Sequence, residues 1–182
     1  MTGQLRNSDK SQIESWIGQG PKHFSLLYSI SKDGCSAQKF HEKCDHQGST
    51  ITVIYNYQGC VFGGYTSASW AACISGSTRD DKAFLFQLKF SGTDTRRQFP
   101  ISDVDYGIYS HPNFGPTFGE YDEFDLKSFS GTINNASGVF QLDGAFTFGT
   151  HFDMTGVSSW DEIHDGVVTV TDIEVYSVAG KY

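Results

Sequence analysis

Six carboxylates lie between residues 103 and 125, and their spacing comes nearest to that of a chemical site. They are Asp103, Asp105, Glu120, Asp122, Glu123 and Asp125. Calcium takes about six to eight oxygen ligands from carboxylates and loop carbonyls, and this stretch could supply several of them. The spacing is not that of an EF-hand, because the glycine and the final glutamate of that loop are missing.

Two other readings of the same acidic segment stay open. Aromatic residues interleave with the carboxylates, as they do in glycan sites where a ring stacks on the sugar and acids bind its hydroxyls. A plain strand with a solvated acidic edge is the simpler explanation. It would place Tyr121 and Glu123 on one side and Asp122 and Phe124 on the other.

A second set of possible metal ligands is Cys35, His41, Cys44 and His46. Thiolates and imidazoles bind zinc, and His41 and Cys44 would meet if the segment is helical. However, the spacing between the two cysteines fits no common zinc finger, and no CxxC pair occurs. The pattern favours surface histidines beside reduced, buried thiols. No GxSxG motif is present either, so no serine is singled out as a nucleophile.

The stretch from Cys60 to Trp70 starts as a strand and is interrupted by Gly63 and Gly64. Adjacent glycines in a strand mark close approach of a second backbone or of a ligand. The stretch is therefore a tightly packed junction or a surface that the backbone presents to a partner. On the second reading, the interface candidates are Gly63, Gly64, Tyr65 and Trp70.

Bulk composition excludes several classes of protein. The 182 residues suffice for one domain with a core, and the formal charge of −8 argues against binding nucleic acid. No apolar run approaches the roughly 20 residues of a transmembrane helix. The first twenty residues lack the apolar region of a signal peptide, so we expect a cytoplasmic protein. We divide the chain into an N-terminal segment, 1–19, and a single domain, 20–182.

Two short helices are expected to flank the strands. Ser11 and Glu14 have the spacing of a capping box, and a helix there would turn Ile13, Trp16 and Ile17 towards a sheet. Ser36 is a plausible N-cap for a second helix over 37–45, in which Phe40 and Cys44 would share a face.

Alternating or β-branched runs predict most of the remaining structure. The clearest strands are 24–30, 50–57, 83–90, 144–152 and 167–178. In the third of these, Phe84, Phe86, Leu88 and Phe90 would lie on one face. Residues 56–59 predict a hairpin turn, 71–81 a polar loop and 91–97 a polar turn. In total, about eight or more strands predict a mainly β fold, a two-sheet antiparallel β-sandwich flanked by short helices.

Several of these stretches together resemble the TLDc domain of oxidation-resistance proteins. The most specific is the run that begins Val61-Phe62-Gly63-Gly64-Tyr65-Thr66-Ser67 and continues to Trp70. The others are Phe24–Tyr28, Ala83–Leu88, Gly115–Gly119 and Asp172–Tyr176, so the resemblance covers about residues 20–180. It implies a two-sheet β-sandwich, no established catalytic chemistry, and a family role for Gly63 and Gly64 as contact or fold determinants.

The resemblance also implies protection against oxidative stress and binding to the vacuolar proton-pumping ATPase (V-ATPase). The leading hypothesis is thus a non-catalytic protein-binding domain that needs no cofactor. The alternative is a soluble lectin-like protein that recognises glycans, with calcium bound by the acidic segment.

Overall fold

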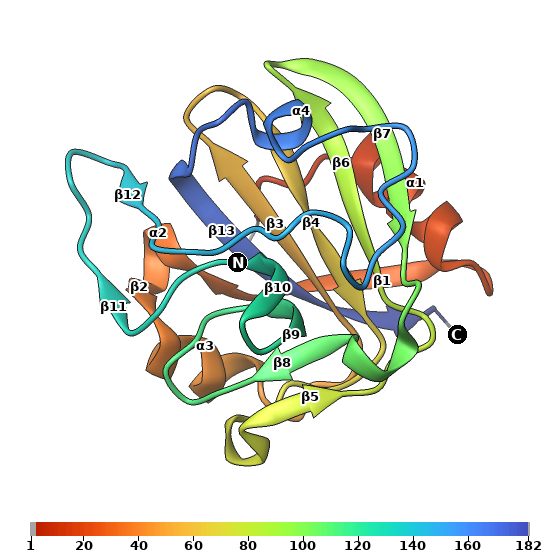
Figure 1. Ribbon diagram of the computed structural model, residues 1–182, viewed down its shortest axis with the longest axis horizontal. Coiled ribbons are helices and arrows are strands. Elements are labelled where there is room, and N and C mark those ends of the chain that lie inside the picture. Colours follow the sequence, from red (N-terminus) through yellow and green to blue (C-terminus); the bar gives the residue numbers. More distant parts are fainter. Residues whose placement is uncertain (1–2, 182) are drawn as a thin grey trace.

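The computed structural model describes residues 3–181 and shows a mainly β fold with short helices (Figure 1). The helices are α1 (Asn7–Ile17), α2 (Ile30–Asp33), α3 (Ala37–Cys44) and α4 (Asp161–His164), with 3₁₀ turns η1 (Ala72–Ile74) and η2 (Val104–Tyr106). The strands are β1 (Lys22–Ser29), β2 (Cys35–Ser36), β3 (Thr50–Asn56), β4 (Val61–Thr66), β5 (Gly76–Thr78), β6 (Phe84–Phe90), β7 (Thr93–Pro100), β8 (Ile108–Ser110), β9 (Thr117–Glu120), β10 (Glu123–Lys127), β11 (Thr132–Ile133), β12 (Phe140–Gln141) and β13 (Thr169–Gly180).

One antiparallel sheet organises the fold. Its strands run in the order β1-β13-β3-β4-β6-β7, and β12 adds a short pairing to β13. The last strand, β13, therefore lies between the first strand, β1, and β3. Strands from the two ends of the chain are thus neighbours in the same sheet. Three two-stranded antiparallel sheets make up the other strands of residues 3–181: β9 with β10, β2 with β11, and β5 with β8.

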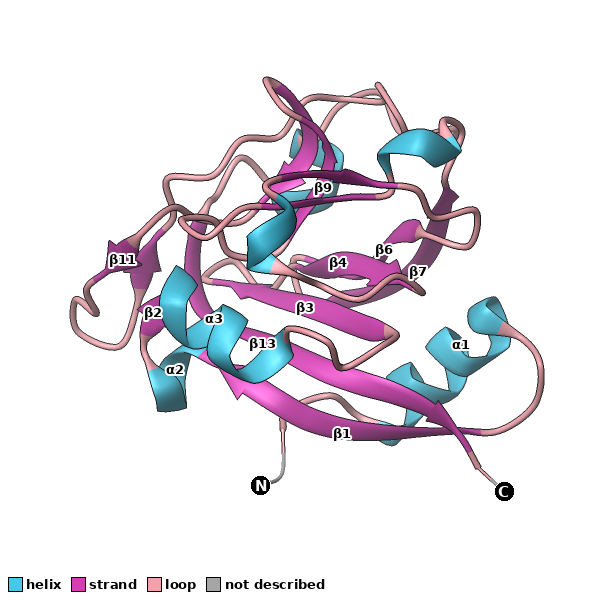
Figure 2. Ribbon diagram, turned by 90° about the horizontal axis from the view of Figure 1, so that it is seen from below, coloured by secondary structure: helices cyan, strands magenta, loops and turns pink. Residues whose placement is uncertain are grey.

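The large sheet buries both of its faces. Figure 2 shows α1 on one side of the sheet and the layer that contains β9 on the other. Ile13 of α1 is fully buried in the smaller cluster, and the ring of Trp16 lies 6.1 Å from that of Phe84. The predicted two-layer antiparallel fold is confirmed, although the second layer consists of short hairpins and helices and not of one continuous sheet.

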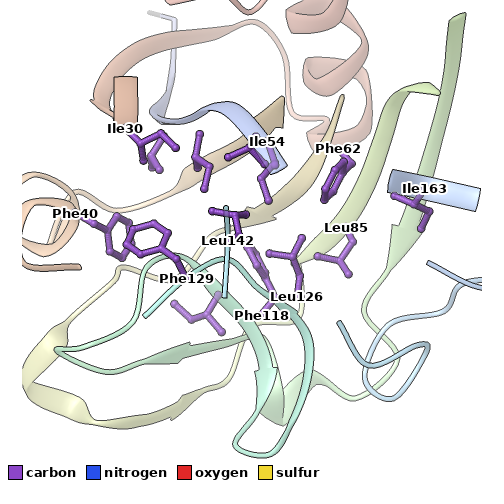
Figure 3. Close-up of a cluster of buried hydrophobic side chains, with 14 of the residues drawn as sticks. Ile30, Phe40, Ile54, Phe62, Leu85, Phe118, Leu126, Phe129, Leu142 and Ile163 are labelled. Carbon is purple, nitrogen blue, oxygen red and sulfur yellow. The ribbon is translucent and has the colours of Figure 1, made fainter. Parts of the chain in front are cut away.

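The larger core fills the space between the sheet and the second layer. Figure 3 shows side chains of the sheet, such as Ile54 and Phe62, pointing towards Phe118, Leu126 and Phe129 of the second layer. All five are at most 1% exposed. Because the segment around β9 and β10 contributes such residues to this core, its backbone is fixed relative to the sheet.

Both expected helices form, but only one begins as predicted. Ser36 caps α3, since its hydroxyl accepts a hydrogen bond from the Lys39 amide. Helix α1 begins at Asn7, so Ser11 lies inside the helix and the predicted capping box is wrong. Within residues 3–181, no helix has both the length and the apolar character required to cross a bilayer.

Strands with exposed faces were the hardest to predict. The polar turn predicted over 91–97 is confined to Ser91 and Gly92. Residues 93–100 instead form strand β7, a mostly exposed edge strand. The predicted loop 71–81 contains η1 and β5. The predicted strand 144–152 is irregular apart from single bridges at Ala145 and Phe152.

The prediction for the faces of β6 is correct except at its end. Phe84, Phe86 and Leu88 join the cluster beneath α1, whereas Phe90 packs against the larger core on the opposite face. The register with β7 shifts between Gln87 and Lys89, and this irregularity changes the face on which later side chains lie.

Candidate functional site

The acidic segment folds into a hairpin that brings two glutamates together. Strands β9 and β10 pair with Glu120 opposite Glu123, and Tyr121 and Asp122 form the turn between them. Asp122 has a φ of 66°, which aspartate tolerates in turns. The simple strand predicted for this segment is therefore wrong, because the turn folds the two glutamates against each other.

Beyond the turn, a bulge aims a carboxylate into the protein. The register of β10 shifts between Phe124 and Leu126, and Asp125 at the shift is fully buried. Gly119 opposite has a φ of 102°, and a Cβ there would lie 2.8 Å from an Asp125 carboxylate oxygen. The bare glycine thus leaves room for this carboxylate, as bulges near functional sites often require.

Asp125 holds His151, which lies in the long connection between β12 and α4. One carboxylate oxygen lies 2.7 Å from Nδ1 of the imidazole, and the carboxylate also accepts hydrogen bonds from the Thr150 and His151 amides. The His151 carbonyl accepts hydrogen bonds from the Ser102 and Asp103 amides. Asp125 therefore holds the side chain while Ser102 and Asp103 hold the backbone, and only 3% of the residue is exposed.

The other ring nitrogen of His151 faces the glutamates of the hairpin. Its Nε2 lies 3.7 Å from an Oε2 atom of Glu120. The Tyr106 ring of η2 packs against the imidazole with its centroid at 4.9 Å. One ligand atom each from Glu120, Glu123 and His151 lies within 4.8 Å of the others, so these three side chains could hold a metal ion.

The cluster carries mostly negative potential. Burial raises the pKa of Asp125 despite the hydrogen bonds that it accepts from His151 and Thr150. The charge of Glu120 is the main cause of a raised pKa at Tyr106, and Asp103 and Asp105 add to it. A cation would be attracted to this position.

The structure brings together three of the six carboxylates proposed from the sequence. Glu120, Glu123 and Asp125 surround His151, whereas Asp122 lies in the exposed turn. Asp103 caps η2 through the Asp105 amide, and Asp105 pairs with Arg79.

Sequence reasoning missed His151. The only signal was a lone histidine in a stretch read as a strand, with no spacing that relates it to the hairpin.

The four interface candidates are buried and expose no docking surface, which corrects the reading of this stretch as an external face. Gly63 and Gly64 lie in the middle of β4, Tyr65 is 5% exposed and Trp70 is fully buried. The Trp70 indole donates a hydrogen bond to the Thr50 hydroxyl at 2.8 Å. The alternative reading, a tightly packed junction, describes this stretch.

The cysteine–histidine set does not form a metal site in the described part of the chain. His41 uses both ring nitrogens, one with the Asp45 carboxylate at 2.7 Å and one with the His111 carbonyl at 2.8 Å. It is also buried, contrary to the expected surface position. Cys35 and Cys44 lie in the larger core, as expected for structural thiols.

The fold and the packed glycine stretch define a protein with a mainly β, two-layer domain. A family model described as "TLDc domain" matches residues 4–179, which includes α1 and ends within β13. The chain therefore belongs to the TLDc domain family, a family generally linked to oxidative stress. A comparison with curated proteins found no match.

Proposed function

We propose that this chain is a non-catalytic protein-binding domain that acts in the oxidative-stress response by docking on the cytoplasmic, peripheral sector of the V-ATPase. The observation that carries the proposal is the TLDc match over residues 4–179, nearly the whole chain. The link to the V-ATPase comes from the family resemblance of the sequence, and a shared fold alone does not establish it.

The thiols support an indirect role in protection against oxidants. A thiol must ionise and be accessible to react with an oxidant. Burial raises the pKa of Cys35 to about 12 and raises that of Cys44 as well. Cys60 is fully buried, and Cys73 is the exposed thiol. A domain with this arrangement is better suited to recruiting a partner than to scavenging oxidants itself.

A pull-down with the purified peripheral sector and with native V-ATPase tests this proposal. We expect the folded chain to retain the pump. Exposed apolar side chains are the first positions to probe, namely Tyr57, Ile74 and Phe148, which are 70%, 52% and 37% exposed. Replacing each with alanine leaves the core intact, so a loss of retention would map the contact. No association with native pump under either oxidising or reducing conditions would count heavily against the proposal.

Glycan recognition is a second candidate because of Tyr121. Its side chain is 54% exposed at the tip of the hairpin, beside Glu120 and Glu123. An exposed ring next to carboxylates can stack on a sugar while the acids accept hydrogen bonds from its hydroxyls. A glycan array probed with and without a chelator tests this function. Binding to no glycan under either condition would contradict it.

A further inference from the structure

The imidazole of His151 is buried with one nitrogen that makes no hydrogen bond. Nδ1 is bonded to Asp125, but among residues 3–181 no acceptor or donor lies within hydrogen-bond distance of Nε2. Its nearest charged neighbour is the Glu120 carboxylate, at 3.7 Å. Hydrogen bonds between nitrogen and oxygen span about 2.7–3.2 Å, so this contact is too long to be one. The side chain is thus almost wholly buried, yet this nitrogen has no partner in the described part of the protein and is open to water or to another ligand.

The separation fits two ligands that share an ion. A zinc ion lies about 2.0–2.2 Å from nitrogen and oxygen ligands, which places two tetrahedral ligands about 3.3–3.5 Å apart. The 3.7 Å between His151 and Glu120 is close to this value. Glu120 is partly exposed and Glu123 exposed, so both carboxylates can close the remaining gap without disturbing the core.

The two glutamates also lack a basic partner. They face each other across the hairpin, and like charges in directly opposite positions destabilise a strand pair. Among the ion pairs of the described residues, Glu120 pairs with His151 alone, and Glu123 takes part in none. The nearby Lys127 instead places its ammonium group 4.2 Å from the centre of the Phe114 ring. A bound cation would remove the repulsion between the glutamates.

Asp125 prepares the histidine for this role. The Asp125 carboxylate lies 2.7 Å from Nδ1 and can accept a hydrogen bond from it, an arrangement in which the lone pair of a metal-binding imidazole is at Nε2. Histidines that bind metals almost always donate their other N–H group to a carboxylate or carbonyl in this way. The bulge at Asp125 and the bare Gly119 therefore position His151, the one metal-binding side chain of the three that does not belong to the hairpin.

The ligand types select the metal. Calcium and magnesium prefer oxygen ligands throughout, whereas an imidazole combined with carboxylates suits first-row transition metals. We propose that Glu120, Glu123 and His151 bind a divalent transition-metal ion, with Asp125 as the positioning residue. The remaining coordination positions are open to water. A transition metal takes the place of calcium, one of the readings that the sequence left open for this segment, because the structure adds a nitrogen ligand.

Calorimetric titration of the full chain with Zn²⁺, in the presence of excess Ca²⁺ and Mg²⁺, tests the site. We expect one zinc ion per chain, and Glu120→Gln and Glu123→Gln should each weaken binding by at least about tenfold. Both side chains are on the surface of the hairpin, so these variants should fold. Asp125→Asn should also weaken binding, and the two glutamate variants decide the outcome if it does not fold.

Two variants serve as controls. Asp122→Asn removes one charge from the same turn without removing a ligand, and Cys73→Ser removes the exposed thiol. Both should bind Zn²⁺ nearly as the unmodified chain does. With Co²⁺ as the probe, the spectrum should lack a thiolate charge-transfer band. Equal binding by all variants, loss of binding only in Cys73→Ser, or tighter binding of Ca²⁺ than of Zn²⁺ would each overturn the proposal. The readout is metal binding, so it is independent of any association with the V-ATPase.

Discussion

The ring of Phe118 occupies the space that a side chain at position 64 would need. A Cβ on Gly64 would lie 2.6 Å from the tip of this ring, which is far inside van der Waals contact. The two residues come from opposite layers, since Gly64 belongs to β4 of the large sheet and Phe118 to β9 of the second layer. The glycine of the family motif thus sets the distance between the layers.

Gly64→Ala should therefore destabilise the fold by about 1–3 kcal/mol, the usual range for overpacking a core. The ring of Phe118 can shift only by disturbing Trp70, against which it packs edge to face at 5.7 Å. Unfolding in urea measures the loss. Gly180→Ala is the matched control, because its Cβ would meet no atom within 4 Å. Equal stability of the two variants would contradict this account of the motif.

Gly63→Ala should be the more harmful substitution of the pair. Its Cβ would lie 1.9 Å from the carbonyl oxygen of Thr52 in the neighbouring strand β3. A backbone atom within a sheet cannot move aside as a side chain can, so we expect a larger loss than for Gly64→Ala. Comparing the urea midpoints of the two variants checks the order, and the reverse order would show that the ring is the stiffer neighbour.

Asp80 should prove essential for the turn after β4. Its buried carboxylate accepts hydrogen bonds from the Thr66 hydroxyl at 2.8 Å, the Ser67 amide at 2.7 Å and the Lys82 amide at 3.0 Å. Asp80→Ala leaves these donors without an acceptor, and we expect a loss of about 2–3 kcal/mol in unfolding free energy. The exposed Asp81→Ala is the control and should change little. A neutral result for Asp80→Ala would mean that water replaces the carboxylate.

One thiol in four should react in the native state. Cys73 is exposed on η1, whereas Cys35, Cys44 and Cys60 are at most 1% exposed. Titration with a disulfide reagent should label one thiol rapidly, and all four after denaturation in guanidinium. In a Cys73→Ser variant, the rapid phase should disappear. Rapid labelling of a second thiol would show that the larger core opens readily.

The stability of the protein should fall as the medium becomes mildly acidic, in part through His164. Burial lowers the pKa of His164 below its ordinary value, and Asp161 and Asp165 offset this only partly. Below about pH 6.5 the unfolded chain binds a proton that the folded chain resists, so stability declines from that pH down to the lowered pKa of the folded state.

His164→Phe should remove this component of the pH dependence. The imidazole is surrounded by Phe62, Phe146 and Trp160, and its Nδ1 makes no hydrogen bond. Urea unfolding of both proteins at several pH values between 5 and 8 measures the difference. A difference between them that does not change with pH would show that His164 is not the group responsible.

Local sequence determined the elements whose signals lie within a few residues. The Ser36 cap fixes the start of α3, and the β-branched run of β3 fits a buried strand. The same local signals failed where both faces are exposed or where a chain passes over the core without pairing. Strand β7 is polar because it is an edge, and residues 144–152 are aromatic because they cover the core.

The site itself depended on contacts between distant parts of the chain. The sequence showed that carboxylates gather near residue 120. Only the structure showed that Glu120 pairs with Glu123 and that the bulge turns Asp125 into the protein. His151 reaches them from 26 residues beyond Asp125. Likewise, the glycine pair indicated that another group lies close to this strand. Only tertiary packing showed that, at Gly64, this group is the buried ring of Phe118. Sequence spacing encodes neighbours along a strand or helix, whereas burial and long-range contacts are set when separate elements pack together.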